Sequence, residues 1–278
     1  MNVLELEYNN RLRLPHAAAT IKEWATTAEA YRAECASEGR AEIGLQYGGT
    51  PGQTVDIFWP RQDTAKHICV FVHGGYWQLF NPSFFSHVAK GANENGVPMA
   101  LIGYDLCPGV RIETIIEQIR TGCSFIWRRH NRRLVMSGHS AGGHLTAAMM
   151  SIDWASAAAG FDSSTVTAGV AISGVFELAP LMQTSINDKL LLDDRRASIL
   201  SPVHWRPLPG ALLDAWVGAN ESSEFRRQSQ EFVATWKQAG ANTTLMSVAN
   251  ADHFQAIAPL SDPDSDLTQR LVNLASRD

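Results

Sequence analysis

Short apolar runs alternate with helical segments along most of this chain, and this alternation restricts its fold more than any other feature. A helical segment at 15–38 and a strand at 53–60 come first. The later strands are expected at 66–75, 97–105, 133–137, 166–174, 211–218 and 242–249, and the later helices at 83–96, 112–130, 141–152, 224–240 and 264–276. Such a succession predicts an α/β fold with a mostly parallel central sheet and helices on both faces. Functional residues are then expected in loops at the carboxyl ends of the strands.

The length of 278 residues suits a single domain, residues 1–278, with a buried core. The polar, proline-containing segment 177–209 is too long for a simple connection, and we expect it to form a small lid over the site. The net charge of −5 gives no electrostatic reason to expect nucleic acid or an anionic membrane as a partner. Four cysteines at irregular spacings predict neither a disulfide framework nor a zinc site.

The N-terminal sequence MNVLELEYNN lacks the basic and apolar regions of a signal peptide. No apolar run approaches the roughly 20 residues of a membrane-spanning helix. We therefore expect a cytoplasmic protein that acts on a small molecule. Its oligomeric state is left open, with a homodimer among the alternatives.

The stretch RRLVMSGHSAGGHLTAAMM, residues 132–150, places a serine between an apolar strand and a helix-forming segment. Gly138 and Gly142 let the backbone turn sharply around Ser140, as in the nucleophile elbow of hydrolases. A glycine-rich turn can also serve packing alone, but its position between a clear strand and a clear helix favours the chemical interpretation. We therefore expect Ser140 to be a nucleophile.

A second glycine pair ends the strand 66–75, in His73-Gly74-Gly75-Tyr76-Trp77. In a parallel sheet this loop lies beside the Ser140 turn. Hydrolases with such an elbow bind the developing oxyanion with backbone N–H groups from this loop and from the residue after the nucleophile. For the His73 side chain itself we expect a structural role in the core.

A serine nucleophile needs a base, and His253 is favoured among the nine histidines. It alone follows the last expected strand, and the chain order nucleophile, acid, histidine agrees with that position. The acid is expected after the strand 211–218, in a loop that contains Glu221 and Glu224. Glu221 lies in the loop itself, whereas Glu224 falls in the first helical turn, where the helix dipole makes carboxylates common. We expect Glu221 to orient His253, and Glu224 is the alternative.

Together these motifs resemble those of the α/β-hydrolase superfamily and, more narrowly, of the kynurenine formamidase (arylformamidase) family. The family motif HGGxW is similar to residues 73–77, and its GHSAG motif to residues 138–142. Its acid loop, usually D-S-P-E-F, is similar to Glu221-Ser222-Ser223-Glu224-Phe225, with glutamate in place of the aspartate and serine in place of the proline. Weaker similarities elsewhere extend the resemblance over nearly the whole chain.

The resemblance implies a serine hydrolase that works without a metal or an organic cofactor. Its substrate would be an aryl formamide, with N-formylkynurenine converted to kynurenine and formate through an acyl-enzyme. The N–H groups of its oxyanion hole would be those of Gly75, Tyr76 and Ala141. We expect three aromatic side chains to contact the aryl ring, namely Trp77, Phe176 and Phe254. The alternative for each is a place in the hydrophobic core.

Two other functions are compatible with the same motifs. A carboxylesterase for short-chain or aryl esters would use the same catalytic residues with a different pocket. A binding protein of the same fold would have lost those residues, and the presence of Ser140, His253 and a nearby acid argues against it.

Overall fold

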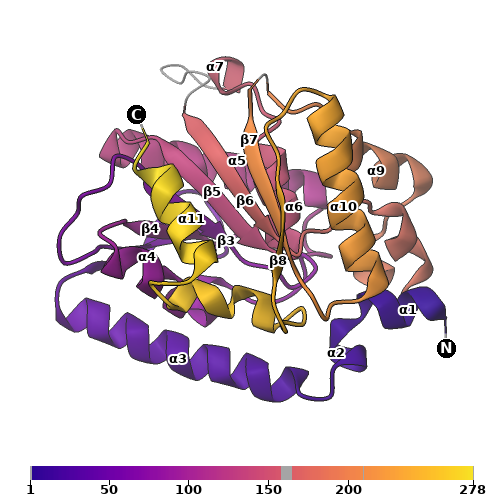
Figure 1. The fold of residues 1–278 in the computed structure, drawn as a ribbon, viewed down its shortest axis with the longest axis horizontal. Coiled ribbons are helices and arrows are strands. Elements are labelled where there is room, and N and C mark those ends of the chain that lie inside the picture. The colour runs from indigo at the N-terminus through magenta and orange to yellow at the C-terminus, as the bar shows by residue number, and fades with distance from the viewer. Residues whose placement is uncertain (1, 158–164, 209, 278) are drawn as a thin grey trace.

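Eight strands form one sheet among the residues that the computed structural model describes, which are 2–157, 165–208 and 210–277 (Figure 1). The strands are β1 Ala41–Gln46, β2 Thr54–Phe58, β3 Ile68–Val72, β4 Met99–Ile102, β5 Leu134–His139, β6 Val166–Ile172, β7 Leu212–Gly218 and β8 Leu245–Val248. Their order across the sheet is β1-β2-β4-β3-β5-β6-β7-β8. The pairs β1–β2 and β2–β4 are antiparallel and the other neighbours are parallel. The mostly parallel α/β sheet expected from the sequence is confirmed.

Helices cover both faces of this sheet (Figure 1). The longer ones are α3 Ala17–Ser37, α5 Ile112–His130, α6 Ala141–Met149, α10 Ser223–Gln238 and α11 Asp266–Ala275. The shorter ones are α1 Val3–Tyr8, α2 Asn10–Arg13, α4 Lys90–Glu94, α7 Trp154–Ala157, α8 Asn187–Leu190 and α9 Asp194–Ile199. The 3₁₀ segments are η1 Pro82–Ala89, η2 Ala179–Gln183, η3 Pro202–His204 and η4 Gln255–Ser261.

The inner strands are buried on both sides because each is a short apolar run. Along β3, Val70 and Val72 contact one core cluster, which also contains residues of α5, α6 and α10. Cys69 and Phe71 contact the opposite cluster, which contains residues of α3 and α11. Successive side chains of a strand point to opposite faces, so one continuous apolar run supplies both layers of the core.

Three elements near the N-terminus leave little trace in the sequence pattern. The helices α1 and α2 have six and four residues, too few for an apolar period. Each follows an asparagine, Asn2 or Asn9, whose side chain accepts a hydrogen bond from the first helical turn. The strand β1 lies at the sheet edge, is partly exposed, and contains an irregularity between Glu42 and Leu45.

The expected helix 83–96 is instead the 3₁₀ segment η1 followed by the α-helix α4. Apolar spacing alone does not distinguish these two helix types.

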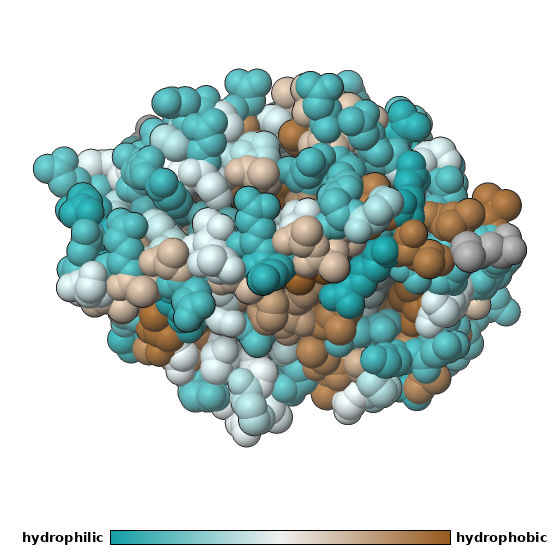
Figure 2. Space-filling model, turned by 90° about the horizontal axis from the view of Figure 1, so that it is seen from below, coloured by the Kyte–Doolittle hydropathy of each residue, from teal (hydrophilic) through white to brown (hydrophobic). Residues whose placement is uncertain are grey.

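Hydrophobic side chains on the surface gather at the N-terminal end of the molecule, at the right of Figure 2. Val3, Leu6 and Leu12 belong to the short N-terminal helices and are largely exposed. These helices expose apolar residues to solvent, so they lack the sequence pattern of a helix with one buried apolar face. No helix in the described ranges combines the length and the apolar character needed to cross a lipid bilayer.

The segment 177–209, apart from residue 209, which lies outside the described residues, contains η2, α8, α9 and η3. It is bonded to the N-terminal helix α1, beside which it lies in Figure 1. Nδ2 of Asn2 donates to the carbonyl of Gln183 at 2.6 Å, and the Ser185 hydroxyl donates to the Glu5 carboxylate at 2.6 Å. That the segment opens and closes as a lid stays a prediction.

Candidate active site

Ser140 lies at the carboxyl end of β5, in the turn that leads directly into α6. Its backbone has φ 57° and ψ −117°, which is an unfavourable region for a residue with a side chain. The N–H of Ser140 donates to the carbonyl of Ile172 at 2.8 Å. Gly142 passes so close to β3 that a Cβ there would stand 1.9 Å from the carbonyl oxygen of Val72. The turn therefore requires glycine at 142, and close packing keeps Ser140 in its strained conformation.

His253 and Glu221 come together from the loops that follow β8 and β7. Nδ1 of His253 lies 2.7 Å from Oε2 of Glu221, and both side chains are buried. Oε1 of Glu221 accepts hydrogen bonds from the N–H of Gly218 at 2.8 Å and from the Ser173 hydroxyl. Because a carboxylate only accepts, the His253 proton in this pair belongs to Nδ1. The lone pair of the neutral imidazole is then on Nε2.

Glu224, in the first turn of α10, is directed away from His253. Its Oε2 accepts a hydrogen bond from the Tyr8 hydroxyl at 2.7 Å and lies 2.8 Å from Nη2 of Arg227. The hydrogen bond from Arg227 lowers the pKa of Glu224. Of the two carboxylates that the sequence leaves open, only Glu221 contacts the histidine, while Glu224 ties the N-terminal segment to α10.

The loop 73–77 passes directly against the Ser140 turn, since a Cβ on Gly74 would stand 2.9 Å from Cβ of Ser140. Nδ1 of His73 donates to the carbonyl of Gly74 at 2.9 Å, and its ring stacks on Tyr104 with 4.2 Å between centroids. Burial lowers the pKa of His73 to about 4, so the ring is neutral near pH 7. The His73 side chain thus packs in the core and shapes this loop.

Three backbone N–H groups in this loop and next to the serine have no acceptor among the described residues. Gly75 has φ 100°, Tyr76 has φ 51° and Trp77 has φ 57°, so three successive residues of the loop have positive φ. In the part of the chain that the structure describes, the N–H groups of Gly75, Tyr76 and Ala141 donate no hydrogen bond. Ala141 directly follows Ser140 and begins α6. Gly75 and Tyr76 line the same cavity as Ser140. Backbone N–H groups without an internal acceptor can bind an anionic oxygen.

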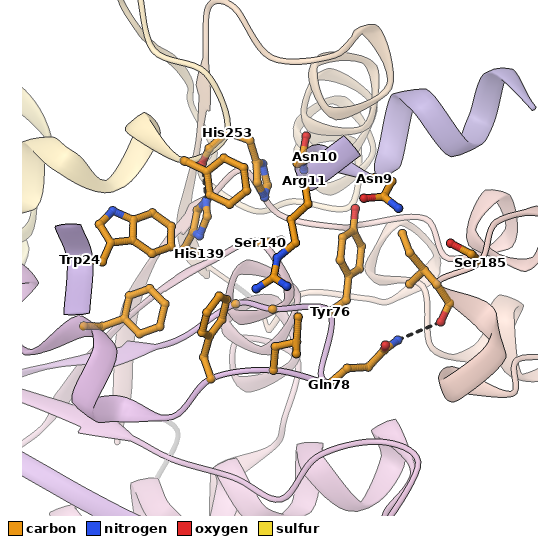
Figure 3. Close-up of a pocket in the computed structure, with 17 residues that line it drawn as sticks. Asn9, Asn10, Arg11, Trp24, Tyr76, Gln78, His139, Ser140, Ser185 and His253 are labelled. Atoms are coloured by element: carbon orange, nitrogen blue, oxygen red, sulfur yellow. Dashed lines mark hydrogen bonds between the residues drawn. The ribbon is translucent and has the colours of Figure 1, made fainter. Parts of the chain in front are cut away.

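Ser140 and His253 line the same cavity, which has a volume of about 210 Å³ (Figure 3). The other lining residues are Asn9, Asn10, Arg11, Trp24, Gly74, Gly75, Tyr76, Gln78, Leu79, Phe80, Phe85, His139, Ser185, Ile186 and Phe254. None of these described lining residues is an aspartate or a glutamate. Nowhere in the described ranges do three His, Cys, Asp or Glu side chains gather as metal ligands would.

The aromatic wall of the cavity differs from the expectation. Phe254 lines the cavity, but Trp77 and Phe176 are fully buried outside it. The Trp77 ring packs edge-on against His144 at 4.9 Å, and the Phe176 ring stacks on Phe232 at 3.9 Å. Both rings are therefore used in core packing, and neither lines this cavity. Besides Tyr76 and Phe254, the aromatic lining comes from three residues without a sequence motif, Trp24, Phe80 and Phe85.

His139 lines the cavity and supports His253. Its Nε2 donates to the backbone carbonyl of His253 at 2.8 Å, and the two rings lie 4.6 Å apart. Its ring also meets Trp24 edge-on at 6.3 Å. Burial holds the pKa of His139 well below the usual range for histidine. A neutral His139 therefore fixes the loop that carries His253 without adding a second charge beside it.

The N-terminal segment forms a wall of the cavity, which the sequence motifs do not predict. Asn9, Asn10 and Arg11 all line it, and Figure 3 shows the Arg11 side chain extending into it. The only local signal is the Asn9-Asn10 pair, which indicates a helix start. No spacing rule connects such a helix boundary to a distant nucleophile elbow.

Comparison with known proteins gives a consistent result. A family model described as the alpha/beta hydrolase fold matches residues 69–256. The kynurenine formamidase of Salmo salar is 29% identical over 244 residues, covering 84% of this chain and 82% of that protein. The kynurenine formamidase of Danio rerio is 26% identical over 285 residues, covering 99% and 96%. A crystal structure described as a putative thioesterase from Silicibacter sp. TM1040 is 34% identical with a TM-score of 0.87, covering 97% of this chain and 98% of that one.

Proposed function

Because this chain belongs to the α/β-hydrolase fold family and is a hydrolase, we propose that it cleaves aryl formamides with Ser140, His253 and Glu221 as a catalytic triad. One observation carries the proposal. A serine in a strained strand-to-helix turn shares a cavity with a histidine whose Nδ1 is 2.7 Å from a buried carboxylate. Nucleophile, base and orienting acid are the parts that acyl transfer needs.

Proton transfer begins the reaction. His253 carries its proton on Nδ1, so its Nε2 accepts the proton of the Ser140 hydroxyl as the oxygen attacks the substrate carbonyl. Glu221 stabilises the imidazolium that results. Its second oxygen is held by Gly218 and Ser173, so the carboxylate does not have to reorganise during the step.

Charge then develops on the carbonyl oxygen of the substrate. The N–H groups of Gly75, Tyr76 and Ala141 are the donors that we assign to this oxyanion. Each is a fixed backbone group, and removing one such donor from a hydrolase typically costs about 10²- to 10³-fold in kcat. Collapse of the tetrahedral intermediate breaks the C–N bond, and His253 returns its proton to the departing aryl amine.

Water completes the cycle. The acyl-enzyme carries a formyl ester on Ser140, His253 deprotonates a water molecule, and hydrolysis releases formate and the free serine. N-formylkynurenine is the substrate that we assign, since relatives named kynurenine formamidase match most of this chain. The aromatic side chains of Trp24, Phe80 and Phe254 in the cavity wall suit the aryl ring.

An ester-cleaving function is the alternative. It is favoured by the 34% identical structure described as a putative thioesterase, since the same residues can transfer an acyl group from an ester. A carboxylesterase for short-chain or aryl esters would therefore use this triad with a different leaving group.

A substrate panel tests the assignment. We would measure kcat/KM for N-formylkynurenine, formanilide and nitrophenyl acetate, with Ser140→Ala as the control for uncatalysed turnover. The proposal predicts that N-formylkynurenine has the largest kcat/KM and that Ser140→Ala abolishes its cleavage. Rapid ester cleavage without formamide cleavage would instead establish the carboxylesterase alternative.

A further inference from the structure

The cavity beside Ser140 carries a positive charge that the chain itself does not neutralise. Arg11 lines this cavity, and its guanidinium carbon lies 5.6 Å from the centroid of the Phe80 ring. Among the described residues, Arg11 forms no ion pair and no carboxylate lines the cavity. A guanidinium held over an aromatic face, in a pocket without acids, favours an anionic ligand.

A second group in the same wall lacks a partner. Asn10 is only 5% exposed, lines the cavity, and its Nδ2 donates to no acceptor among the described residues. Buried amide groups are almost always hydrogen-bonded, because an unpaired buried donor costs free energy. A ligand with an acceptor oxygen at this point would satisfy it.

The chain immediately before both residues is held in place before any ligand binds. The Tyr8 hydroxyl is bonded to Glu224 and its backbone carbonyl accepts from the Tyr76 hydroxyl at 2.6 Å. The Asn9 side chain donates to Glu5 at 2.8 Å. The segment that carries the two groups is therefore fixed to the loop that we assign to the oxyanion hole, which lowers the entropy cost of using it for recognition.

We propose that Asn10 and Arg11 form a subsite for a carboxylate on the leaving group of the substrate. The assignment to the leaving group rests on the proposed function, because a formyl group has no substituent that could carry a charge. A carboxylate has two oxygens, so it can accept from the Asn10 amide and the Arg11 guanidinium together. The subsite makes the enzyme selective for aryl formamides whose leaving group carries a carboxylate over those without one.

Two ligands that differ in one charge test this selectivity. N-formylkynurenine carries the carboxylate, and its carboxamide derivative does not. We would measure kcat/KM for both with the wild type, Arg11→Gln, Asn10→Leu and Arg13→Gln. Arg13 lies in the same helix α2 and does not line the cavity, so Arg13→Gln removes an equal charge as a matched control.

Arg11→Gln is expected to lower the preference for the carboxylate over the carboxamide by about 10-fold. This lies between the few-fold effect of an exposed ion pair and the hundred-fold effect of a buried charge-assisted hydrogen bond. Asn10→Leu is expected to lower the same ratio by about 5-fold, the effect of one hydrogen bond. Arg13→Gln should leave the ratio unchanged. An unchanged ratio in Arg11→Gln would overturn the proposal.

Binding separates this proposal from the proposed function. Calorimetry with Ser140→Ala measures the Kd of both ligands without turnover, with and without the added Arg11→Gln change. The subsite is supported if the Ser140→Ala protein binds the carboxylate more tightly than the carboxamide and the added Arg11→Gln change removes that difference. This result holds even if the wild type releases no formate. Equal binding of both ligands, or binding of neither, overturns the subsite even if formate release confirms the formamidase.

Discussion

Replacement of Glu221 by glutamine tests the acid of the triad, because the two oxygens of this carboxylate have different partners. Oε1 accepts from the N–H of Gly218 at 2.8 Å, and Oε2 faces Nδ1 of His253 at 2.7 Å. In Glu221→Gln the fixed N–H of Gly218 keeps the amide oxygen on its side. The amide NH₂ then faces His253, where it can only donate.

An amide donor at this position reverses the histidine tautomer. Nδ1 of His253 becomes an acceptor, its proton moves to Nε2, and Nε2 no longer accepts the proton of Ser140. The corresponding aspartate-to-asparagine change in serine proteases costs about 10⁴-fold in kcat, also through the wrong tautomer. We expect a loss of roughly 10²- to 10⁴-fold in kcat here, since water can partly replace the longer side chain.

Glu224→Gln is the matched control, as it lies three residues away in the first turn of α10 and changes charge in the same way. It loses an ion pair to the 40% exposed side chain of Arg227 and keeps an amide oxygen that accepts from the Tyr8 hydroxyl. We expect less than a threefold change in kcat and a loss of up to about 1 kcal/mol in the free energy of unfolding. Steady-state kinetics and urea unfolding of both variants decide the matter. A silent Glu221→Gln beside an inactive but folded Glu224→Gln would refute the assignment of the acid.

Three further predictions concern the turn, the buried histidines and metals. Gly142→Ala should lower the free energy of unfolding, measured by urea titration, by about 3 kcal/mol or more, because its Cβ would stand 1.9 Å from the Val72 carbonyl oxygen. Gly49→Ala is the control and should be nearly neutral, because a Cβ at that position would have no atom within 4 Å. Burial holds the pKa of His73 and His144 at about 4, against about 6.5 in the unfolded chain. As the pH falls, the unfolded chain binds these protons first, so the free energy of unfolding should be highest above pH 6.5 and should decrease by about 2 kcal/mol per histidine between pH 7 and pH 5. A His144→Gln variant should show a smaller decrease, and an equal decrease would contradict the linkage. Dialysis against EDTA should leave kcat unchanged, and recovery of lost activity on adding zinc would contradict the proposed mechanism.

The sheet was predictable because its inner strands are continuous apolar runs. A run such as Ile68–Val72 must lie between two layers of helices, and the same reasoning places Ser140 at a strand end. The positions of Glu221 and His253 follow from the order of the strands, which brings their loops to one edge. Motif position alone did not decide between Glu221 and Glu224, since the choice depends on side-chain direction at the start of α10.

The cavity wall was less predictable because its residues come from elements that pack around the site. The sequence suggested Trp77 for ring contact because it lies near the predicted site, but its side chain turns into the core against His144. Trp24 reaches the cavity from α3, a helix with no motif. Arg11 reaches it from a four-residue helix that shows no period. Such contacts depend on tertiary packing, which short-range patterns do not encode.

Covalent labelling tests the central claim, that Ser140 is a nucleophile activated by His253. The protein would be treated with a fluorophosphonate, and the modified peptide identified by mass spectrometry while residual activity is followed. We expect one phosphonyl adduct per chain, on Ser140, formed in step with the loss of activity and absent from a folded His253→Ala variant on the same timescale. Full activity in a protein labelled at Ser140, or complete inactivation by an adduct on another residue, would contradict the account.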